Sequence, residues 1–239
     1  MLDLERINTF RGTAHVLQGV SLTVNDAEAV CLVGRNGAGK TTTIESIIGL
    51  LPVRSGKITF QEREITQLPP HERARLGIGY APEDAGIFPD LTVAENFLIS
   101  QWLAGASGKS GSSSSSSEVQ DGILAVFPEV RTFMQRRGLN LSGGQKKMVA
   151  IARAMALSPS ILLLDEPFEG LAPVVVSRFI EAVKKIKAMG ISLLIAASNL
   201  TTASRVADRL YAIDRGEIIF QGDPQSAFAN EDVMKTIRG

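Results

Sequence analysis

Residues 29–41 read AVCLVGRNGAGKT, an apolar run followed by a glycine-rich loop that ends in lysine and threonine. The loop, residues 34–41, fits the pattern G-x-x-x-x-G-K-[ST], and the apolar run supplies the strand that this pattern needs before its helix. Glycines let backbone N–H groups surround phosphate oxygens, and a helix that begins near Lys40 adds the positive end of its dipole. The stretch therefore predicts a phosphate-binding loop in an α/β fold, with Lys40 at the β- and γ-phosphates and Thr41 holding Mg²⁺. A glycine-rich turn with a surface lysine is the alternative.

Residues 161–167, ILLLDEP, form a short apolar run that ends in two acids. Such a run is typical of a central parallel strand buried on both faces. Ligands of doubly wound sheets bind outside the carboxyl ends of the strands, so we expect Asp165 near the metal ion and Glu166 near the γ-phosphate. Asp165 would orient the metal, and Glu166 would take a proton from the attacking water. The alternative is that both acids only cap the strand before a turn.

Residues 141–145, LSGGQ, open an amphipathic segment that extends to Leu157. Its apolar residues recur at helical spacing, and Ser142 is the expected N-cap. Two glycines at a helix start expose N–H groups to an anion, which makes this a second phosphate site. The first loop already accounts for the phosphates of one nucleotide. The economical arrangement is therefore a head-to-tail pair in which each chain closes on the nucleotide of the other.

The loop, the LSGGQ pentapeptide and the LLLDEP strand together resemble the nucleotide-binding subunit of an ATP-binding cassette transporter, over nearly the whole chain. Within that family, further strings resemble the importers of branched-chain amino acids, amides and urea, in particular the second of their two ATPase subunits. These strings lie at residues 34–43, 70–79, 82–83, 87–89, 91–93, 127–128 and 169–173.

The resemblance implies a single cassette domain over residues 1–239. Its fold would be an α/β P-loop nucleotide-binding fold: a mostly parallel central sheet flanked by helices, an N-terminal antiparallel β subdomain, and an inserted helical subdomain at about 67–157. The hydrophobic pattern agrees with this organisation. It predicts strands at 16–24, 161–164 and 191–195, helices at 41–49 and 174–189, and a hairpin around 214–216.

The resemblance also implies ATP and Mg²⁺ as cofactors and a second nucleotide-binding subunit as partner, in a homo- or heterodimer. Residues 168–171 match the loop that crosses such a dimer. The segment Glu83–Trp102 matches the one that docks on integral membrane permease subunits. It contains an apolar loop patch, which often marks a partner site, made of Ile87, Phe88, Pro89 and Leu91. Ordinary packing under a helix is the alternative.

Carried over residue by residue, the resemblance assigns roles to three sets of residues. The phosphates would be bound by Asn36, Gly37, Ala38, Gly39, Lys40, Thr41 and Thr42. The nucleotide of the partner chain would be contacted by Ser142, Gly143, Gly144 and Gln145. The metal would be held by Thr41, Glu83 and Asp165, and hydrolysis would use Glu166, Glu83 and Ser198.

Three positions depart from the commonest pattern of the family. Glu83 stands where most members have Gln, but a carboxylate can also bind Mg²⁺ or order a water. Arg11, with Phe10 beside it, stands where an aromatic ring usually stacks on the adenine base. The plane of an arginine can also stack on a base, but we expect weaker nucleotide affinity or weaker base preference. Ser198 replaces the switch histidine, which predicts a chemical step slower by on the order of 3 kcal/mol, or about a hundredfold. A serine that only ends a strand is the alternative.

A fourth departure is the run GASGKSGSSSSSSE at 105–118, whose only apolar residue is Ala106. Such a run has nothing to bury and predicts a flexible linker in place of part of the helical subdomain. A natural low-complexity insertion, an engineered bridge and a phosphorylation target are all open interpretations.

Composition restricts the function further. Lys+Arg and Asp+Glu number 25 each, so no net positive charge draws the chain to nucleic acid. The single cysteine, Cys31, permits no intrachain disulfide and fits a reducing compartment. The N-terminus does not read as a signal peptide, and no apolar run reaches the 18 or so residues of a membrane span. We therefore expect a peripheral location on the cytoplasmic face of the membrane, through permease subunits.

Three functions compete at this point. The leading one is an ATPase that energises an importer, of branched-chain amino acids or of related amides or urea, by closing on two ATP molecules. The second is a degenerate regulatory subunit that binds ATP and hydrolyses it poorly, which Ser198 and Arg11 favour and Glu166 opposes. The third is a soluble cassette protein of translation or DNA maintenance, which the neutral charge and the single phosphate loop disfavour.

Overall fold

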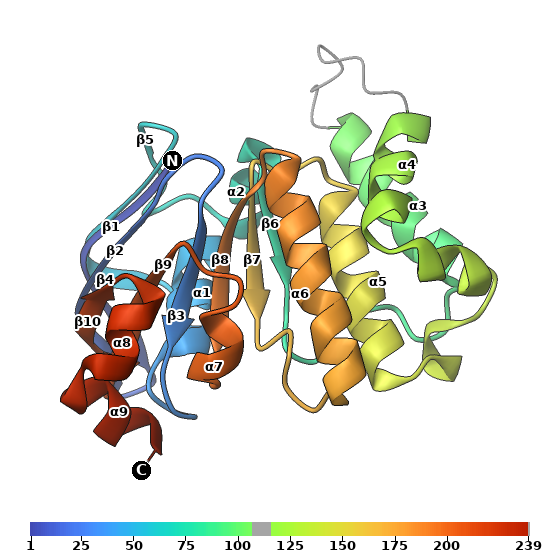
Figure 1. Ribbon diagram of the computed structural model, residues 1–239. Coiled ribbons are helices and arrows are strands. Elements are labelled where there is room, and N and C mark those ends of the chain that lie inside the picture. Colours follow the sequence, from blue (N-terminus) through green and yellow to red (C-terminus); the bar gives the residue numbers. More distant parts are fainter. Residues whose placement is uncertain (107–115, 239) are drawn as a thin grey trace.

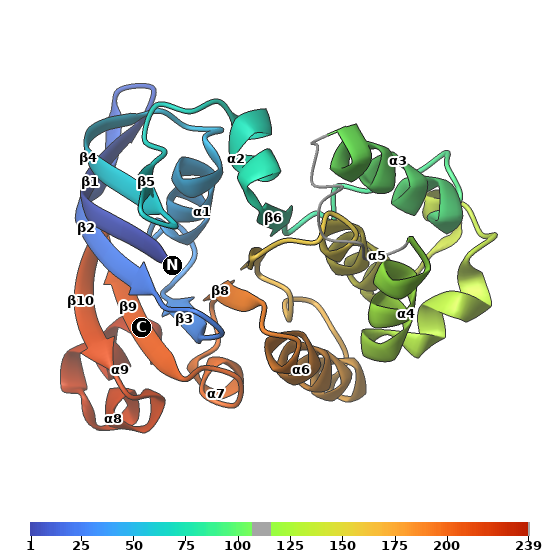
Figure 2. The ribbon, with the colours of Figure 1, turned by 90° about the horizontal axis from the view of Figure 1, so that it is seen from above.

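The computed structural model describes residues 1–106 and 116–238, and its strands form two sheets. The first sheet is antiparallel, in the order β2-β1-β4-β5. Its strands are β1 (Leu2–Arg11), β2 (Ala14–Val24), β4 (Val53–Phe60) and β5 (Arg63–Glu64). This sheet confirms the predicted N-terminal antiparallel β subdomain, and it curves around one end of the molecule in Figure 2.

The second sheet has the order β10-β9-β3-β8-β7-β6 and is parallel except for the terminal hairpin of β9 and β10. Its strands are β3 (Ala29–Val33), β6 (Ile78–Ala81), β7 (Ile161–Asp165), β8 (Ser192–Ala197), β9 (Arg209–Asp214) and β10 (Glu217–Gly222). The strand that leads into the phosphate loop, β3, lies between β8 and β9. This confirms the mostly parallel central sheet.

The core has two parts, one on each face of the parallel sheet. Val30 and Leu32 of β3 pack with the antiparallel sheet, whereas Cys31 and Val33 pack with the helices of the other face. Successive strand residues point to opposite faces. Because both faces are covered, nearly every position of β3, β7 and β8 must be apolar, which explains their continuous hydrophobic runs.

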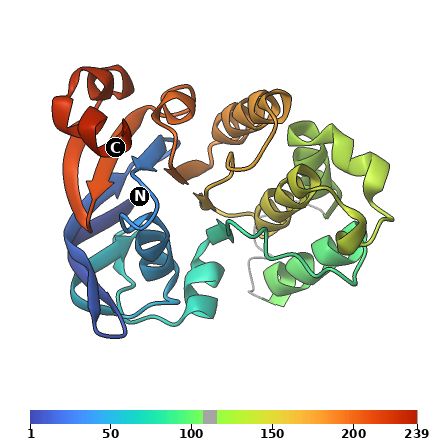
Figure 3. The same ribbon diagram turned by 90° about the horizontal axis from the view of Figure 1, so that it is seen from below.

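Helix α1 (Lys40–Ile48) lies between the two sheets, and α5 (Gly143–Met155) and α6 (Pro173–Ala188) cover the other face of the parallel sheet. Helices α3 (Val93–Ala106) and α4 (Ser116–Val126) gather around α5 at the end of the molecule remote from the antiparallel sheet (Figures 2 and 3). The shorter helices are α2 (Pro70–Leu76), α7 (Leu200–Ala203), α8 (Pro224–Ala229) and α9 (Glu231–Arg238), with 3₁₀ turns η1 (Pro128–Phe133) and η2 (Gly138–Asn140).

Two of the predicted boundaries change. The predicted mostly helical range at about 67–157 also contains the strand β6, which pairs with β7 in the parallel sheet. The predicted flexible linker at 105–118 is wrong at both of its ends, since 105–106 lie in α3 and 116–118 in α4, while 107–115 fall outside the described residues. Side-chain composition missed these ends because backbone hydrogen bonds carry a helix through polar residues. The other predicted elements differ from the observed ones by one or two residues at their ends.

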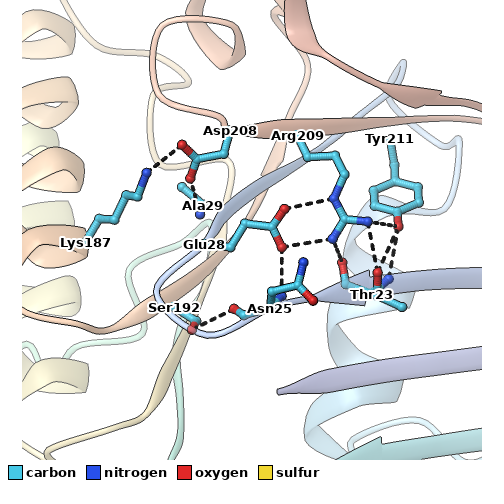
Figure 4. Close-up of polar contacts among 9 residues, drawn as sticks. All are labelled: Thr23, Asn25, Glu28, Ala29, Lys187, Ser192, Asp208, Arg209 and Tyr211. Atoms are coloured by element: carbon cyan, nitrogen blue, oxygen red, sulfur yellow. Dashed lines mark hydrogen bonds and ion pairs between the residues drawn. The ribbon is translucent and has the colours of Figure 1, made fainter.

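A polar network joins the two sheets at the amino ends of β3 and β9 (Figure 4). The guanidinium of Arg209 donates to both carboxylate oxygens of Glu28, at 2.8 and 2.9 Å, and to the hydroxyl and carbonyl oxygens of Thr23 on β2, each at 2.9 Å. The hydroxyl of Tyr211 accepts a further bond from Arg209 at 2.9 Å. A bidentate arginine fixes orientation as well as distance. The network therefore fixes the antiparallel sheet against the parallel sheet, at the strand ends opposite the phosphate loop.

Among the described residues, no helix has the length and hydrophobicity that crossing a membrane requires.

Candidate active site

The phosphate loop connects β3 to α1, and its glycines are required by the backbone. Gly39 caps α1 at φ 117°, in the left-handed region that glycine adopts without a steric cost. A Cβ on Gly34 would lie 2.4 Å from the carbonyl oxygen of Ile213 on β9, which is closer than a carbon atom can approach. The loop can therefore turn inward beside β9 only with glycine at these positions, and this turn with the start of α1 is the kind of backbone that binds an anion.

A cavity of about 430 Å³ lies over this loop. It brings together residues from β1, β2, α1, the segment after β6 and the end of β7, which are far apart in the sequence. Nine of the predicted site residues line it, together with Val16. They are Arg11, Asn36, Gly37, Gly39, Lys40, Thr41, Thr42, Glu83 and Glu166. Ala38 belongs to the same loop but is buried beneath it.

Lys40 is buried and is surrounded by oxygen atoms. Its Nζ donates to the carbonyl oxygens of Gly34 at 2.8 Å and Arg35 at 3.1 Å, and it forms an ion pair with the carboxylate of Glu166 at 3.0 Å. A buried ammonium needs such partners, because an unpaired charge in a protein interior is costly. The same ammonium could exchange its carboxylate partner for a phosphate that enters the cavity.

Asp165 ends β7 and is 2% exposed, yet neither of its carboxylate oxygens has a hydrogen-bond partner among the described residues. Burial raises its pKa to about 6, although the neighbouring Thr41 hydroxyl and Lys40 ammonium act in the opposite direction. A buried carboxylate without partners is energetically unfavourable, and a divalent cation would supply the missing positive charge.

The donor set around Asp165 fits Mg²⁺. The hydroxyl of Thr41 and the carboxylate of Glu83 line the adjacent cavity, so three oxygen donors meet there. The described residues contain no cluster of three or more acidic, histidine or cysteine side chains that could hold a metal without help. Mg²⁺ is usually held by one or two carboxylates together with substrate phosphates and water, so an all-protein cage is not needed.

Glu166 follows β7 in a left-handed conformation, with φ 44°, which is strained for a residue with a side chain. Ser198, just beyond the end of β8, holds its carboxylate: the backbone N–H of Ser198 donates to Oε2 at 3.0 Å, and its hydroxyl lies 2.5 Å from Oε1. The same hydroxyl lies 3.0 Å from Oδ1 of Asn36 in the phosphate loop. Ser198 is therefore in direct contact with the carboxylate of Glu166.

Phe10 and Arg11 do not share one role. Arg11 lines the cavity, where its Nε donates to the hydroxyl of Thr42 at 3.2 Å and its guanidinium pairs with the carboxylate of Glu45. The ring of Phe10 instead stacks on His15, with centroids 4.3 Å apart, and does not line the cavity. Neighbouring strand residues point to opposite faces, so only one of the pair can face the cavity. The inclusion of Phe10 among the site residues is therefore not supported by this geometry.

The pentapeptide begins α5, as expected from its glycines and serine. The hydroxyl of Ser142 accepts from the N–H of Gln145 at 3.3 Å, and the side chain of Gln145 accepts from the N–H of Ser142 at 3.0 Å, which is a complete capping box. None of residues 142–145 lines the cavity over the phosphate loop. A single chain thus keeps its two predicted phosphate sites apart.

The segment Glu83–Trp102 presents large apolar side chains to the surface. Phe88, Leu98 and Trp102 are 46%, 41% and 66% exposed, and Leu139 of η2 is 50% exposed. The side-chain oxygen and nitrogen of Asn96, which is buried, bond to the backbone N–H and carbonyl of Phe88 and so fix this loop. Ile87 and Leu91 of the predicted patch are only half exposed. We refer to Phe88, Leu98, Trp102 and Leu139 as the exposed apolar residues.

Sequence reasoning missed two polar residues near the site. Lys147 on α5 contacts the backbone that carries Glu166, and Glu45 on α1 holds Arg11. No motif marks either residue. Helical spacing could have placed Glu45 four residues after Thr41 on the same face of α1, but the partner of Lys147 lies on a strand end that is distant in the sequence.

Comparisons with known proteins agree with the fold. The family model described as "ABC transporter" matches residues 17–169. The chain is 38% identical to the lipopolysaccharide export system ATP-binding protein LptB of Haemophilus influenzae, over 100% of the chain and 97% of that protein. It is 32% identical to a probable branched-chain amino acid transport ATP-binding protein, LivF, of Archaeoglobus fulgidus, over 100% of the chain and 99% of that protein. The ADP conformation of MJ1267, an ATP-binding cassette of an ABC transporter, superposes with a TM-score of 0.84 at 29% identity, covering 100% and 98% of the two chains.

Proposed function

The chain belongs to the ABC transporter family as an ATP-binding subunit with ATPase activity, and we propose that it energises an importer of branched-chain amino acids or of related amides or urea. The observation that carries the catalytic part of this proposal is the pair Lys40 and Glu166 in the wall of one cavity, with Ser198 bonded to the Glu166 carboxylate and the buried Asp165 next to it in sequence. The solute rests on the strings shared with importer subunits and on the similarity to LivF along the whole chain.

ATP binding would begin by separating an ion pair. When the β- and γ-phosphates enter the cavity, the Lys40 ammonium moves its charge from the Glu166 carboxylate to the phosphates. The loop N–H groups and the start of α1 add donors to the same anion. Thr41, Glu83 and Asp165 would hold Mg²⁺, which neutralises phosphate charge when it is bound. The release of Lys40 leaves the carboxylate of Glu166 free to accept a proton.

Glu166 is the proposed general base of hydrolysis. Its carboxylate lies at the cavity wall, where it can take a proton from a water aligned with the γ-phosphate. Ser198 would keep this carboxylate in place through its N–H and hydroxyl groups. A serine cannot supply the positive charge of a histidine, so we expect a functional but slow chemical step. The short contact between Ser198 and Glu166 favours this over a subunit without hydrolysis, which is the second candidate.

Two chains would be needed for a complete site. Because residues 142–145 lie outside the cavity, the N–H groups of Gly143 and Gly144, which the capping box does not use, would bind the nucleotide of a partner chain. We propose a head-to-tail dimer, homo- or heteromeric, that closes on two ATP molecules. We propose that the exposed apolar residues, Phe88, Leu98, Trp102 and Leu139, form an apolar docking face for integral membrane permease subunits, and that the chain works on the cytoplasmic face of a membrane.

A second transported class is supported by one specific observation, the 38% identity to LptB over the full chain. That protein belongs to a lipopolysaccharide export system, so an export role is the competing assignment. Permease subunits of the two classes differ, and the apolar docking face would distinguish between them.

The decisive experiment has two stages. Steady-state Mg·ATP hydrolysis by the purified chain is measured first, with Glu166→Gln as the blank; activity above the blank is expected, and activity equal to it would favour the regulatory subunit. The chain is then copurified with permease subunits of a branched-chain amino acid importer and, separately, of a lipopolysaccharide exporter. Binding and stimulated hydrolysis with the importer subunits alone support the proposed solute, and the opposite result assigns export.

The contact itself is tested by Phe88→Ala and Trp102→Ala. Both should reduce copurification without reducing hydrolysis by the isolated chain. Phe228→Ala on α8, which also removes an exposed aromatic ring, is the matched control and should copurify normally.

A further inference from the structure

Lys147 lies on α5, two residues after the pentapeptide, and reaches the segment that follows β7. Its Nζ donates to the carbonyl oxygen of Glu166 at 2.5 Å and to that of Glu169 at 2.9 Å. An ammonium has three donors, and bonds from a charged donor are stronger than those between neutral groups. The contact thus joins the helix that carries the pentapeptide to the turn that carries the proposed base.

The turn held by Lys147 is strained. Glu166 has φ 44°, and its carbonyl also accepts the N–H of Glu169 at 3.3 Å, a long hydrogen bond. Strained backbone persists only where the surrounding structure imposes it. Lys147 bridges the two carbonyls at the start and the end of this turn, and so supplies part of that restraint.

The environment of Lys147 explains why its ammonium stays at these carbonyls. Burial lowers its pKa, while the nearby carboxylates of Glu169, Glu83 and Glu166 favour its charged form. The bond to the Glu166 carbonyl is partly buried, so an apolar side chain at 147 would leave that oxygen with only the long bond from Glu169 and would remove the Lys147 donor from the Glu169 carbonyl.

We propose that Lys147 is a positioning residue for hydrolysis, which fixes the backbone from which the Glu166 carboxylate projects. Because Lys147 moves with α5, it also links that carboxylate to Ser142 at the start of the same helix. A partner nucleotide bound at Ser142 would therefore be sensed at the base of this chain. The inference rests on the proposed role of Glu166 and adds a connection between the two sites of the dimer.

The first test is kinetic and compares Lys147→Met with Lys147→Arg. The methionine variant should lose about tenfold to a hundredfold in kcat with KM for ATP changed less than threefold, because a small misplacement of a catalytic group is costly and the phosphate loop is intact. Arginine keeps the charged donors and should recover most of kcat. Lys146→Met removes the neighbouring charge on α5 and should stay within about twofold of the wild type, since Lys146 makes no side-chain hydrogen bond among the described residues.

The second test does not depend on activity. Hydrogen exchange of the Glu169 amide, in the nucleotide-free chain, should be about tenfold faster in Lys147→Met than in the wild type and unchanged in Lys146→Met. Thermal unfolding of each variant shows whether it folds. If the methionine variant does not fold, Lys147→Gln replaces it; the neutral amide keeps two of the three N–H donors, and an intermediate loss of kcat is expected.

Three results would overturn the inference: unchanged kcat in Lys147→Met, equal losses at Lys146 and Lys147, or unchanged exchange at Glu169. Glu166→Gln separates this outcome from a failure of the proposed mechanism. If Glu166→Gln abolishes hydrolysis and Lys147→Met does not affect it, only the role of Lys147 is wrong; if Glu166→Gln is active, the base is misassigned.

Discussion

Replacing Asp165 with asparagine should change how the stability of the metal-free protein depends on pH. Burial raises the pKa of Asp165 from its usual 3.8 to about 6. The folded chain therefore binds this proton more tightly than the unfolded chain does. This tighter proton binding stabilises the folded state. The stabilisation is fully present below about pH 4 and is lost as the pH rises through about 6. Asparagine carries no titrating proton and removes this dependence.

The magnitude follows from the two pKa values. Each tenfold difference in proton affinity corresponds to about 1.4 kcal/mol, so the full loss is about 3 kcal/mol. Between pH 5.0 and 7.5, the contribution of Asp165 protonation to the free energy of unfolding falls by about 1.4 kcal/mol. For a chain of this size, 1 kcal/mol shifts Tm by about 2–4 °C, which gives a relative shift of about 3–5 °C.

The assay is thermal unfolding by calorimetry in EDTA without nucleotide, at several pH values. The titration of other groups affects the wild type and Asp165→Asn equally, and burying the amide changes the Tm of the variant by the same amount at every pH. The pH dependence of the Tm difference therefore reports on Asp165 alone. The Tm of the wild type should fall relative to the variant by about 3–5 °C from pH 5.0 to 7.5. Asp90→Asn, which removes an exposed carboxylate, is the control and should show no such trend. A difference between Asp165→Asn and the wild type that is constant with pH would refute the argument from burial.

Three further predictions concern other parts of the chain. Glu166→Gln should trap an ATP-bound dimer, seen by size-exclusion chromatography with saturating ATP; a variant that stays monomeric would contradict the two-chain site. Ser198→His should speed hydrolysis, by up to about a hundredfold if it restores the missing contact, and unchanged or slower turnover would show that the Ser198 contact already fills this role. Arg73 is buried and donates to the carbonyls of Ser46 and Ile47 at the end of α1. Arg73→Met should therefore lower the free energy of unfolding, measured by urea denaturation, by about 3 kcal/mol. A decrease below about 0.5 kcal/mol would mean that water replaces the guanidinium.

Local patterns were sufficient to predict much of this molecule. The phosphate loop, the α5 capping box and the buried strand that ends in Asp165 each depend on neighbours in sequence, because turn geometry, helix caps and strand burial are local properties. The predicted sheets and the site around Lys40 followed from these elements.

Contacts between distant segments were not predictable in the same way. The choice between Phe10 and Arg11 depends on which face of β1 meets α1, and a one-residue difference in register reverses it. The assignment of β6 to the parallel sheet depends on its pairing with β7, more than eighty residues later. The contact of Lys147 with Glu166 required the packing of α5 beside the end of β7, which no string of residues records.

The order of strands in the parallel sheet has a consequence for how this chain is made. Both neighbours of β3 are formed by later residues, β8 and β9, and the phosphate loop packs against Ile213 and hydrogen-bonds to Gly216. A ribosome adds about 5–20 residues per second, so more than a hundred residues must follow the loop before its support exists. Until the last strands leave the ribosome, the nascent chain carries the complete glycine-rich sequence without a folded loop. We therefore expect nucleotide binding to begin only after β9 and Gly216 have left the ribosome, and a product truncated before β9 should not bind nucleotide.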